Sequence, residues 1–201
     1  IKSESFATTS TAIGSGTLAI EFGTYNGDGT FTSNPTKTSK TITIESDQTE
    51  LSSIRDAINE ASAGITASIV NDGSGNRLVI SSDNTGIDNT LKITVDDADG
   101  LDLDNAGLSK LAYDATTGGT ANMTQTVAAQ NATMVVDGIT INKSSNTITD
   151  ALEGVTFNLL KAAPGTTTSL SLSQDTSKIQ TAVSALVGAY NELAKTIGDI
   201  S

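Results

Sequence analysis

The acidic stretch DDADGLDLD, residues 96–104, holds the residue types that could most readily bind a metal ion. Carboxylate oxygens are the ligands that Ca²⁺ takes from loop sites, and the EF-hand loop places them at fixed positions. With Gly100 at the sixth position of such a loop, the first and twelfth positions would be Val95 and Ala106, and neither supplies a side-chain ligand. We therefore interpret the stretch as a solvated acidic turn and predict no metal site.

Histidine and cysteine are absent from all 201 residues, which removes several kinds of active site. Ser-His-Asp triads, HExxH zinc sites, thiolate nucleophiles, thiolate metal sites and disulfides are all excluded. Gly73-Ser74-Gly75 follows a predicted strand, but Asn76 leads into another strand, whereas a phosphate cradle leads into a helix. Paired carboxylates could cleave a glycoside, yet aromatic residues make up only 3% and offer few platforms for a sugar. We predict no enzyme activity and no cofactor.

The net charge of −12 makes nucleic acid and anionic membrane surfaces poor partners, because both are bound through clustered lysine and arginine. No run approaches the roughly 20 apolar residues that span a bilayer. The sequence begins at Ile1 and shows no signal-peptide pattern, so we expect a piece of a longer protein. Abundant glycine and short alternating stretches predict a mainly β fold with a small-aliphatic core.

Residues 49–80 organise the fold that must position any site. Apolar residues at three- and four-residue steps predict a helix with one buried face. The period then changes to two, which predicts strands over 65–70 and 78–80 joined by a turn over 71–76. The buried helix face is Leu51, Ile54, Ile58 and Ala61, and the inward strand positions are Ile65, Ala67 and Ile69.

Both ends of this helix carry residues that favour capping. Thr49, or Asp47 together with Glu50, could accept hydrogen bonds from the first turn. Gly64 should end the helix, because a left-handed residue there carries no Cβ penalty.

Alternating stretches predict further strands on both sides of this unit. Asp137-Gly138 and Pro164-Gly165 predict hairpin turns. Residues 116–126 are poor in apolar side chains, so we expect a domain boundary near residue 120. The predicted strands are 14–22, 40–45, 91–95, 133–136, 139–142, 155–160 and 167–173, with a loop over 25–40 and a helical turn over 108–113.

The end of the chain shows the spacing of a coiled coil. After Asp175, which we expect to cap the helix, apolar residues recur at steps of 4, 3, 4, 3, 4 and 3. A narrow stripe suits a partner helix better than a broad core, although an amphipathic helix packed on its own β domain would also fit. The partner-helix seam consists of Ile179, Val183, Leu186, Tyr190, Leu193 and Ile197, and Ile200 continues the pattern.

Several stretches resemble the filament-capping family of the bacterial flagellum, also called flagellar hook-associated protein 2. Residues 47–70, DQTELSSIRDAINEASAGITASIV, are similar to the flagellin-type IN motif, with Ile58-Asn59 as its namesake pair. Residues 127–165, VAAQNATMVVDGITINKSSNTITDALEGVTFNLLKAAPG, resemble the start of the family's C-terminal region. Residues 189–193, AYNEL, are similar too, and in this order the resemblance covers nearly the whole chain.

The resemblance implies an α+β, mainly β fold with two β-rich head domains followed by a C-terminal helix. Residues 13–120 would form the outer head domain, which carries the IN motif. It would be inserted into an inner head domain made by a lead-in strand over 1–12 and by 121–175. The helix over 176–201 would begin a coiled-coil-like leg, whose partner helices belong to the rest of the longer protein.

The resemblance also implies a secreted structural protein at the extracellular tip of the flagellar filament. There it would form a ring-like homo-oligomer and promote the insertion and polymerisation of exported flagellin. In some bacteria such a cap also serves adhesion, which adds host surface glycans as partners. The family brings no catalytic, cofactor or metal residues.

Two other functions stay open on the same residues. A hook–filament junction protein, or the variable region of a flagellin, would share the IN motif and act as a filament building block. A carbohydrate-binding adhesin or glycosidase on a β scaffold is the third hypothesis.

Overall fold

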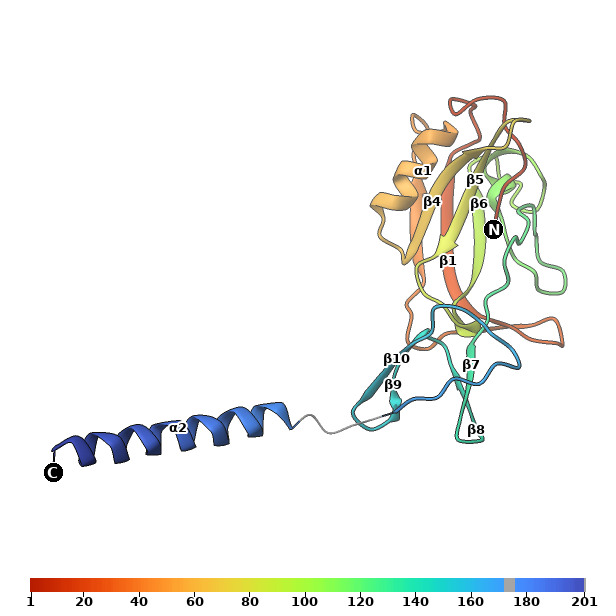
Figure 1. The fold of residues 1–201 in the computed structure, drawn as a ribbon. Coiled ribbons are helices and arrows are strands. Elements are labelled where there is room, and N and C mark those ends of the chain that lie inside the picture. The colour runs from red at the N-terminus through yellow and green to blue at the C-terminus, as the bar shows by residue number, and fades with distance from the viewer. Residues whose placement is uncertain (172–175, 201) are drawn as a thin grey trace. The chain divides into compact units, whose positions relative to one another are not determined.

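The computed structural model describes residues 1–171 and 176–200, and shows antiparallel sheets and a C-terminal helix (Figure 1). This confirms the predicted α+β, mainly β class. The chain divides into two compact units, 1–160 and 161–201. The boundary expected near residue 120 lies inside the first unit, and the division of that unit into outer and inner head domains stays a prediction.

The largest sheet is built around β1 (Gly16–Tyr25), which is antiparallel to three neighbours. Its first half pairs with β3 (Lys40–Ile44), its second half pairs with β2 (Phe31–Ser33), and β6 (Thr90–Asp97) runs along its other edge. β2 lies in the stretch predicted as a loop, because three residues are too few to show a period. The alternating apolar residues of the predicted strands 14–22, 40–45 and 91–95 are buried, except Val95, which is half-buried: Leu18, Ile20, Phe22, Ile42, Ile44, Leu91 and Ile93.

A second sheet pairs β4 (Ile65–Asn71) with β5 (Asn76–Ser82), as the period change predicted. The predicted helix is α1 (Leu51–Glu60), which packs on β4 and also contacts β3. The helix and both sheets share one hydrophobic core. The members of this core that are fully shielded from solvent include Leu51, Ile54, Ile58, Leu78 and Ile80 beside Leu18, Ile20 and Ile93.

Asn59 ties α1 to the outer edge of β4. Its Nδ2 donates to the carbonyl oxygen of Ala67 at 2.9 Å, and its Oδ1 accepts from the Ala67 N–H at 2.8 Å. Ala67 lies opposite Ile80 in the hairpin, so both bonds are made on the edge away from β5. The carboxamide therefore takes the place that a further strand would occupy, and leaves neither backbone group of Ala67 unpaired.

The first turn of α1 is satisfied differently from the prediction. Glu50 is the N-cap residue and makes no side-chain cap hydrogen bond, so neither Thr49 nor the Asp47–Glu50 pair provides the cap. Carbonyl oxygens of the N-terminal lead-in accept from the orphan N–H groups instead. These bonds run from Leu51 N to Thr11 O at 3.0 Å and from Ser52 N to Thr9 O at 2.9 Å.

The C-terminal end of α1 is reached earlier than Gly64. Ser62 already takes a left-handed conformation (φ 49°), and Gly64 (φ 76°) takes the next one. The ammonium group of Lys40 on β3 donates to the carbonyl oxygen of Ala61, where a cation is favoured by the helix dipole.

Single-residue bridges join the two sheets on the side away from α1, so strands and helix enclose the core as an almost closed ring. The lead-in is part of this ring. It lies between β5 and Thr124, and it places Phe6 in the core that residues 13–120 build. The bridges run from Ile93 of β6 to Tyr113, from Tyr113 to Ala121, from Thr124 to Lys2, and from Lys2 to Val79 of β5.

Two isolated hairpins complete the first unit. β7 (Ala132–Val136) pairs with β8 (Ile139–Lys143), and the φ angles of Asp137 (50°) and Gly138 (81°) fit the predicted I′ turn. β9 (Thr147–Leu152) pairs with β10 (Val155–Asn158).

The hairpin predicted at Pro164-Gly165 is wrong. β10 turns back on β9 at Gly154 (φ 76°), and the described residues 167–171 contain no strand. The stretch that becomes β9 was not predicted, because its start reads as a turn (SSNT).

The acidic stretch leads from β6 to the short 3₁₀ helix η2 (Gly107–Leu111). This helix confirms the helical turn predicted there. Another 3₁₀ helix, η1 (Ile87–Asn89), precedes β6. A solvated turn is the wrong description of Asp97, which is only 4% exposed. Its Oδ2 accepts from the Ser109 N–H at 2.9 Å inside η2. Asp97 is therefore a structural carboxylate that fixes the loop to the body.

We predict that Asn59→Asp lowers the free energy of unfolding by about 1–2 kcal/mol at neutral pH, because a carboxylate cannot donate to the Ala67 carbonyl oxygen. Urea unfolding of both proteins measures the difference. Asn142→Asp, the same change at an exposed strand position, is the matched control and should have little effect. Equal losses in the two variants would contradict the role of Asn59.

Burial raises the pKa of Tyr25 to about 12. The ring packs against Phe31 and Tyr113, and its hydroxyl donates to the carbonyl oxygens of Leu91 and Tyr113, each at 3.4 Å. The unfolded chain ionises this phenol near pH 10, so its contribution to stability is complete below that pH and is lost as the pH rises towards 12.

Tyr25→Phe should therefore flatten the alkaline decline of the unfolding free energy. Urea unfolding at several alkaline pH values tests this. Tyr190→Phe, at a residue that is 68% exposed, serves as control and should leave the decline unchanged. A decline of the same steepness in Tyr25→Phe would refute the assignment.

Candidate functional site

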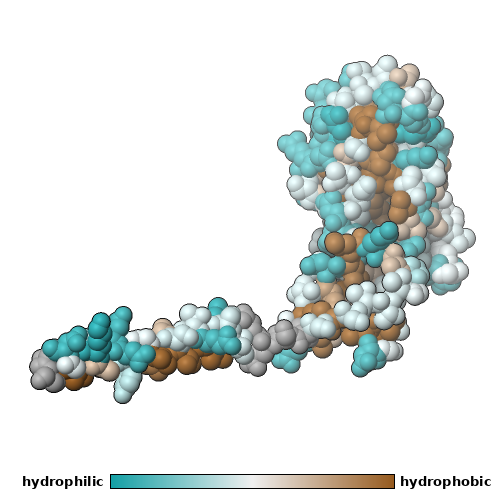
Figure 2. Space-filling model, in the orientation of Figure 1, coloured by the Kyte–Doolittle hydropathy of each residue, from teal (hydrophilic) through white to brown (hydrophobic). Residues whose placement is uncertain are grey.

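The predicted partner-helix seam lies on α2 (Ser177–Ile200), the helix of the second unit. Asp175, expected to cap this helix, is outside the described residues. Figure 2 shows the hydrophobic side chains of α2 gathered in a band along the helix. The seam residues are all exposed: Ile179 (59%), Val183 (55%), Leu186 (71%), Tyr190 (68%), Leu193 (58%) and Ile197 (58%).

Sequence reasoning missed the flanks of this seam. In the heptad that puts Leu186 and Leu193 at position d, the adjoining positions e and g carry no charge. Val187, which is 52% exposed, and three alanines stand where two-stranded coiled coils place glutamate and lysine. The apolar band is therefore wider than the two-in-seven stripe that was predicted. The flanking residues are Ala182, Ala189 and Thr196 on one side, with Gln180, Val187 and Ala194 on the other.

The opposite face of α2 is polar and carries no net charge. Lys178 and Lys195 balance Glu192 and Asp199, and all four lie at heptad positions c and f. Gly188 lies on this face, where a glycine reduces helix stability by about 1 kcal/mol relative to alanine. Helices in proteins are stabilised mainly by packing of their apolar face. The stability of α2 is thus expected to depend on packing of its apolar face.

The namesake pair of the IN motif has a different role. Ile58 is completely buried in the core, and the Asn59 side chain is bonded to β4. The pair therefore holds α1 in place and contributes no apolar side chain to the surface.

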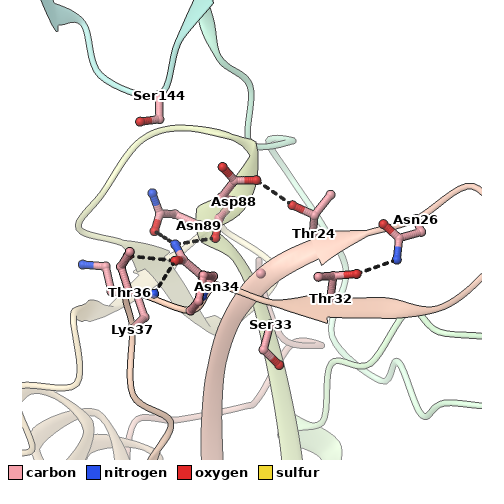
Figure 3. Close-up of a pocket in the computed structure, with 12 residues that line it drawn as sticks. Thr24, Asn26, Thr32, Ser33, Asn34, Thr36, Lys37, Asp88, Asn89 and Ser144 are labelled. Carbon is pink, nitrogen blue, oxygen red and sulfur yellow. Dashed lines mark hydrogen bonds between the residues drawn. The ribbon is translucent and has the colours of Figure 1, made fainter.

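A polar hollow of about 610 Å³ lies beside the β1–β2 hairpin in the first unit (Figure 3). The Nδ2 of Asn34 donates to the Asp88 carbonyl oxygen at 3.1 Å, and the hydroxyl of Thr24 donates to Asp88 Oδ1 at 3.0 Å. The polar side chains that line the hollow thus form hydrogen bonds with other lining residues, and these bonds contain no nucleophile–base pair. Lys37 supplies the one cation among the lining residues, and its ammonium lies 5.9 Å from the centre of the Phe22 ring.

The carboxylates of the acidic loop are used by the loop itself. Asp97 N–H donates to Asp102 Oδ1 at 2.8 Å, Asp99 Oδ1 accepts from the Leu101 N–H at 2.9 Å, and Asp104 Oδ1 accepts from the Ala106 N–H at 3.0 Å. Within residues 1–171 and 176–200, three acidic side chains nowhere come together as a metal site. The same part of the chain contains no helix with the length and apolar character needed to cross a membrane.

Two family profiles match the chain. The profile described as the C-terminus of flagellar hook-associated protein 2 matches residues 129–200, and the profile described as the flagellin hook IN motif matches residues 20–84. The first match includes β7–β10 and α2, and the second includes β2, β3, α1, β4, β5 and the second half of β1 but not β6.

Curated relatives carry the same name. Flagellar hook-associated protein 2 of Salmonella typhimurium is 39% identical over 160 residues, which is 80% of this chain and 32% of the relative. The Escherichia coli K12 protein is 43% identical over 162 residues, which is 80% of this chain and 33% of the relative. The chain thus spans about a third of the length of these relatives.

Solved structures agree with the sequence comparison. The D1-D2-D3 domains of the flagellar cap protein FliD from Escherichia coli give a TM-score of 0.71 at 40% identity, covering 97% of this chain and 60% of theirs. FliD (HAP2) from Pseudomonas aeruginosa PAO1 gives 0.69 at 31% identity, covering 100% of this chain and 85% of its own. The names of these relatives denote a structural part of the flagellum and no reaction. The chain belongs to the flagellar hook-associated protein 2 family, the family of the flagellar cap protein FliD.

Proposed function

We propose that the chain is the head and the beginning of the leg of a structural cap at the extracellular tip of the flagellar filament. In this proposal it acts without catalysis, forms a ring-like homo-oligomer and promotes the insertion and polymerisation of exported flagellin. The observation that carries the proposal is the exposed apolar band of α2, in a chain whose solved relatives are flagellar cap proteins.

The proposed head has an outer domain over 13–120, inserted in an inner one built by 1–12 and 121–175. The pairing of Lys2 with Thr124 supports an insertion, because the incoming and outgoing segments lie side by side. The lead-in also adds Phe6 to the core of the outer domain. In this proposal the lead-in would therefore contribute to the outer domain as well as to the inner one.

The seam would bind more than one helix of the leg. A two-stranded coiled coil keeps charged residues at positions e and g, whereas α2 has small or aliphatic ones at most of them. A band that extends over both flanks can be covered only by neighbours on both sides. We therefore infer that α2 (176–201 in the sequence division) lies between helices of a bundle.

The alternative function is a filament building block, either a hook–filament junction protein or a variable region of flagellin. The match of residues 20–84 to the flagellin hook IN motif favours it, because that motif is described for flagellin. Labelled protein seen by electron microscopy along the shaft, rather than at the tip, would establish the alternative.

Adhesion to host surface glycans is a separate proposal. The polar hollow beside the β1–β2 hairpin offers hydroxyl, amide and carboxylate groups to a sugar. A glycan array with the full-length protein tests it, and binding to no glycan would end it.

The seam predicts how charge on α2 affects stability. Leu186→Asp with Leu193→Asp should change the free energy of unfolding of the first unit by less than about 0.5 kcal/mol, as exposed substitutions do. Chemical denaturation of the isolated chain measures this. A loss of several kcal/mol would show that both leucines are buried in the chain's own core.

The same double variant tests the function in the full-length protein. Cells that carry it should release unpolymerised flagellin and make short filaments, because the leg cannot assemble. The matched control, Ser184→Asp with Asn191→Asp, puts the same two charges on the polar side of α2 and should leave the filaments normal. Normal filaments with the seam variant would overturn the proposed role of α2.

A further inference from the structure

Four aspartates in the described chain are followed by glycine, in the turns at Asp28, Asp72, Asp99 and Asp137. Aspartate–glycine pairs can rearrange without an enzyme, because glycine offers its backbone nitrogen little steric protection. The nitrogen attacks the aspartate Cγ and forms a succinimide ring. Opening of that ring can leave the main chain running through the aspartate side chain, which is isoaspartate.

Three of the four carboxylates are held by hydrogen bonds. Asp28 Oδ1 accepts from the N–H of Thr30 at 3.0 Å and from its hydroxyl at 2.7 Å. Asp99 Oδ1 accepts from the Leu101 N–H at 2.9 Å. A carboxylate in such a bond has to leave it before Cγ can turn towards the following nitrogen.

Asp72 is held most firmly. Its Oδ1 accepts from the N–H and the hydroxyl of Ser74 at 2.9 and 2.6 Å, and its Oδ2 accepts from Arg77 Nε at 2.5 Å. The bonds from Arg77 and Ser74 hold the pKa of Asp72 well below its usual value. Bonds from Thr30 lower the pKa of Asp28 in the same direction. Ring closure proceeds from the protonated carboxyl group, so these aspartates are also protected chemically.

Asp137 differs from the other three in its hydrogen bonding and in its backbone conformation. Its side chain is exposed and makes no hydrogen bond or ion pair within the described part of the chain. Its backbone is left-handed (φ 50°), as the first residue of a type I′ turn requires, whereas the other three aspartates have negative φ angles. It is the first residue of the turn between β7 and β8, so the pairing of these two strands holds its backbone in place.

The hairpin gives this turn little support. β7 and β8 form a two-stranded sheet with no third strand, and such a hairpin is marginally stable by itself. Val135 (64% exposed) and Ile139 (69% exposed) add little buried area near the turn. The turn must open for the Gly138 nitrogen to reach Cγ, and local opening is easiest where few buried contacts resist it.

We propose that Asp137-Gly138 is, of the four aspartate–glycine pairs, the one at which the folded protein forms isoaspartate. The Gly138 nitrogen bonds to Asp137 Cγ, and a carboxyl oxygen leaves as water with the amide proton and the carboxyl proton. Water then adds to the main-chain carbonyl of Asp137 and breaks its bond to the Gly138 nitrogen. The mass is unchanged, one methylene enters the main chain, and the carboxylate moves to the former carbonyl carbon.

The test compares the four turns within one sample of the full-length protein. The protein is kept at mildly acidic pH, folded or in denaturant, and peptides are separated so that isoaspartyl and aspartyl forms are counted. In denaturant the four pairs should react at similar rates. In the folded protein, Asp28, Asp72 and Asp99 should slow by at least about tenfold, since each must first lose a hydrogen bond, while Asp137 should slow much less.

Two variants make the comparison decisive. Arg77→Gln with Ser74→Ala should remove the two side-chain hydrogen bonds to the Asp72 carboxylate, leaving only the bond from the backbone N–H of residue 74, and should raise its rate in the folded state. Gly138→Ala should suppress the reaction at residue 137 in folded and denatured protein alike. Isoaspartate formed in the folded protein first at Asp28, Asp72 or Asp99, or protection of Asp137 equal to theirs, would overturn the proposal.

Discussion

The fold depends on α1 filling the gap between two sheets that have no common edge on that side. With aromatic residues at 3%, the core consists almost entirely of small aliphatic side chains, each of which removes little area from water. Such a core stabilises the fold sufficiently only if its side chains are shielded from water on all sides. The apolar face of α1 provides the enclosure, and the Asn59 carboxamide fixes the helix to β4 by pairing both backbone groups of Ala67. The Ile58-Asn59 pair thus has a structural role, because Ile58 is buried in the core and Asn59 attaches the helix to the sheet.

The periodicity of apolar residues predicted the individual helix and strands of this structure. The helix over 51–60, the hairpin that follows it and the strands around Leu18, Ile42 and Ile93 all follow from repeats of two or about 3.6 residues. Contacts between distant segments were not predictable, because a single-residue bridge has no period. The carbonyl oxygens of the lead-in that accept from the first turn of α1 are an example, and they replaced the side-chain caps that the sequence offered.

The seam of α2 stays a prediction from spacing, and the width of its apolar band was underestimated. Its positions a and d carry large aliphatic residues and Tyr190. The alanine flanks matter because positions e and g lack the charged residues of a two-stranded coiled coil. A search for repeated apolar residues does not detect that absence. In the acidic loop, composition suggested solvation, but Asp97 is buried by its bond to η2, a contact that reaches twelve residues along the chain.

The bridge between Lys2 and Thr124 means that the chain enters and leaves the ring of strands through adjacent segments. The enclosed segment is also joined to the residues that follow it, since the Ile87 N–H donates to Asn131 Oδ1 at 2.9 Å and the Thr85 hydroxyl donates to the Ser144 carbonyl oxygen at 2.7 Å. A turn of this segment that lies away from those contacts can be lengthened or trimmed without altering the path of the chain on either side.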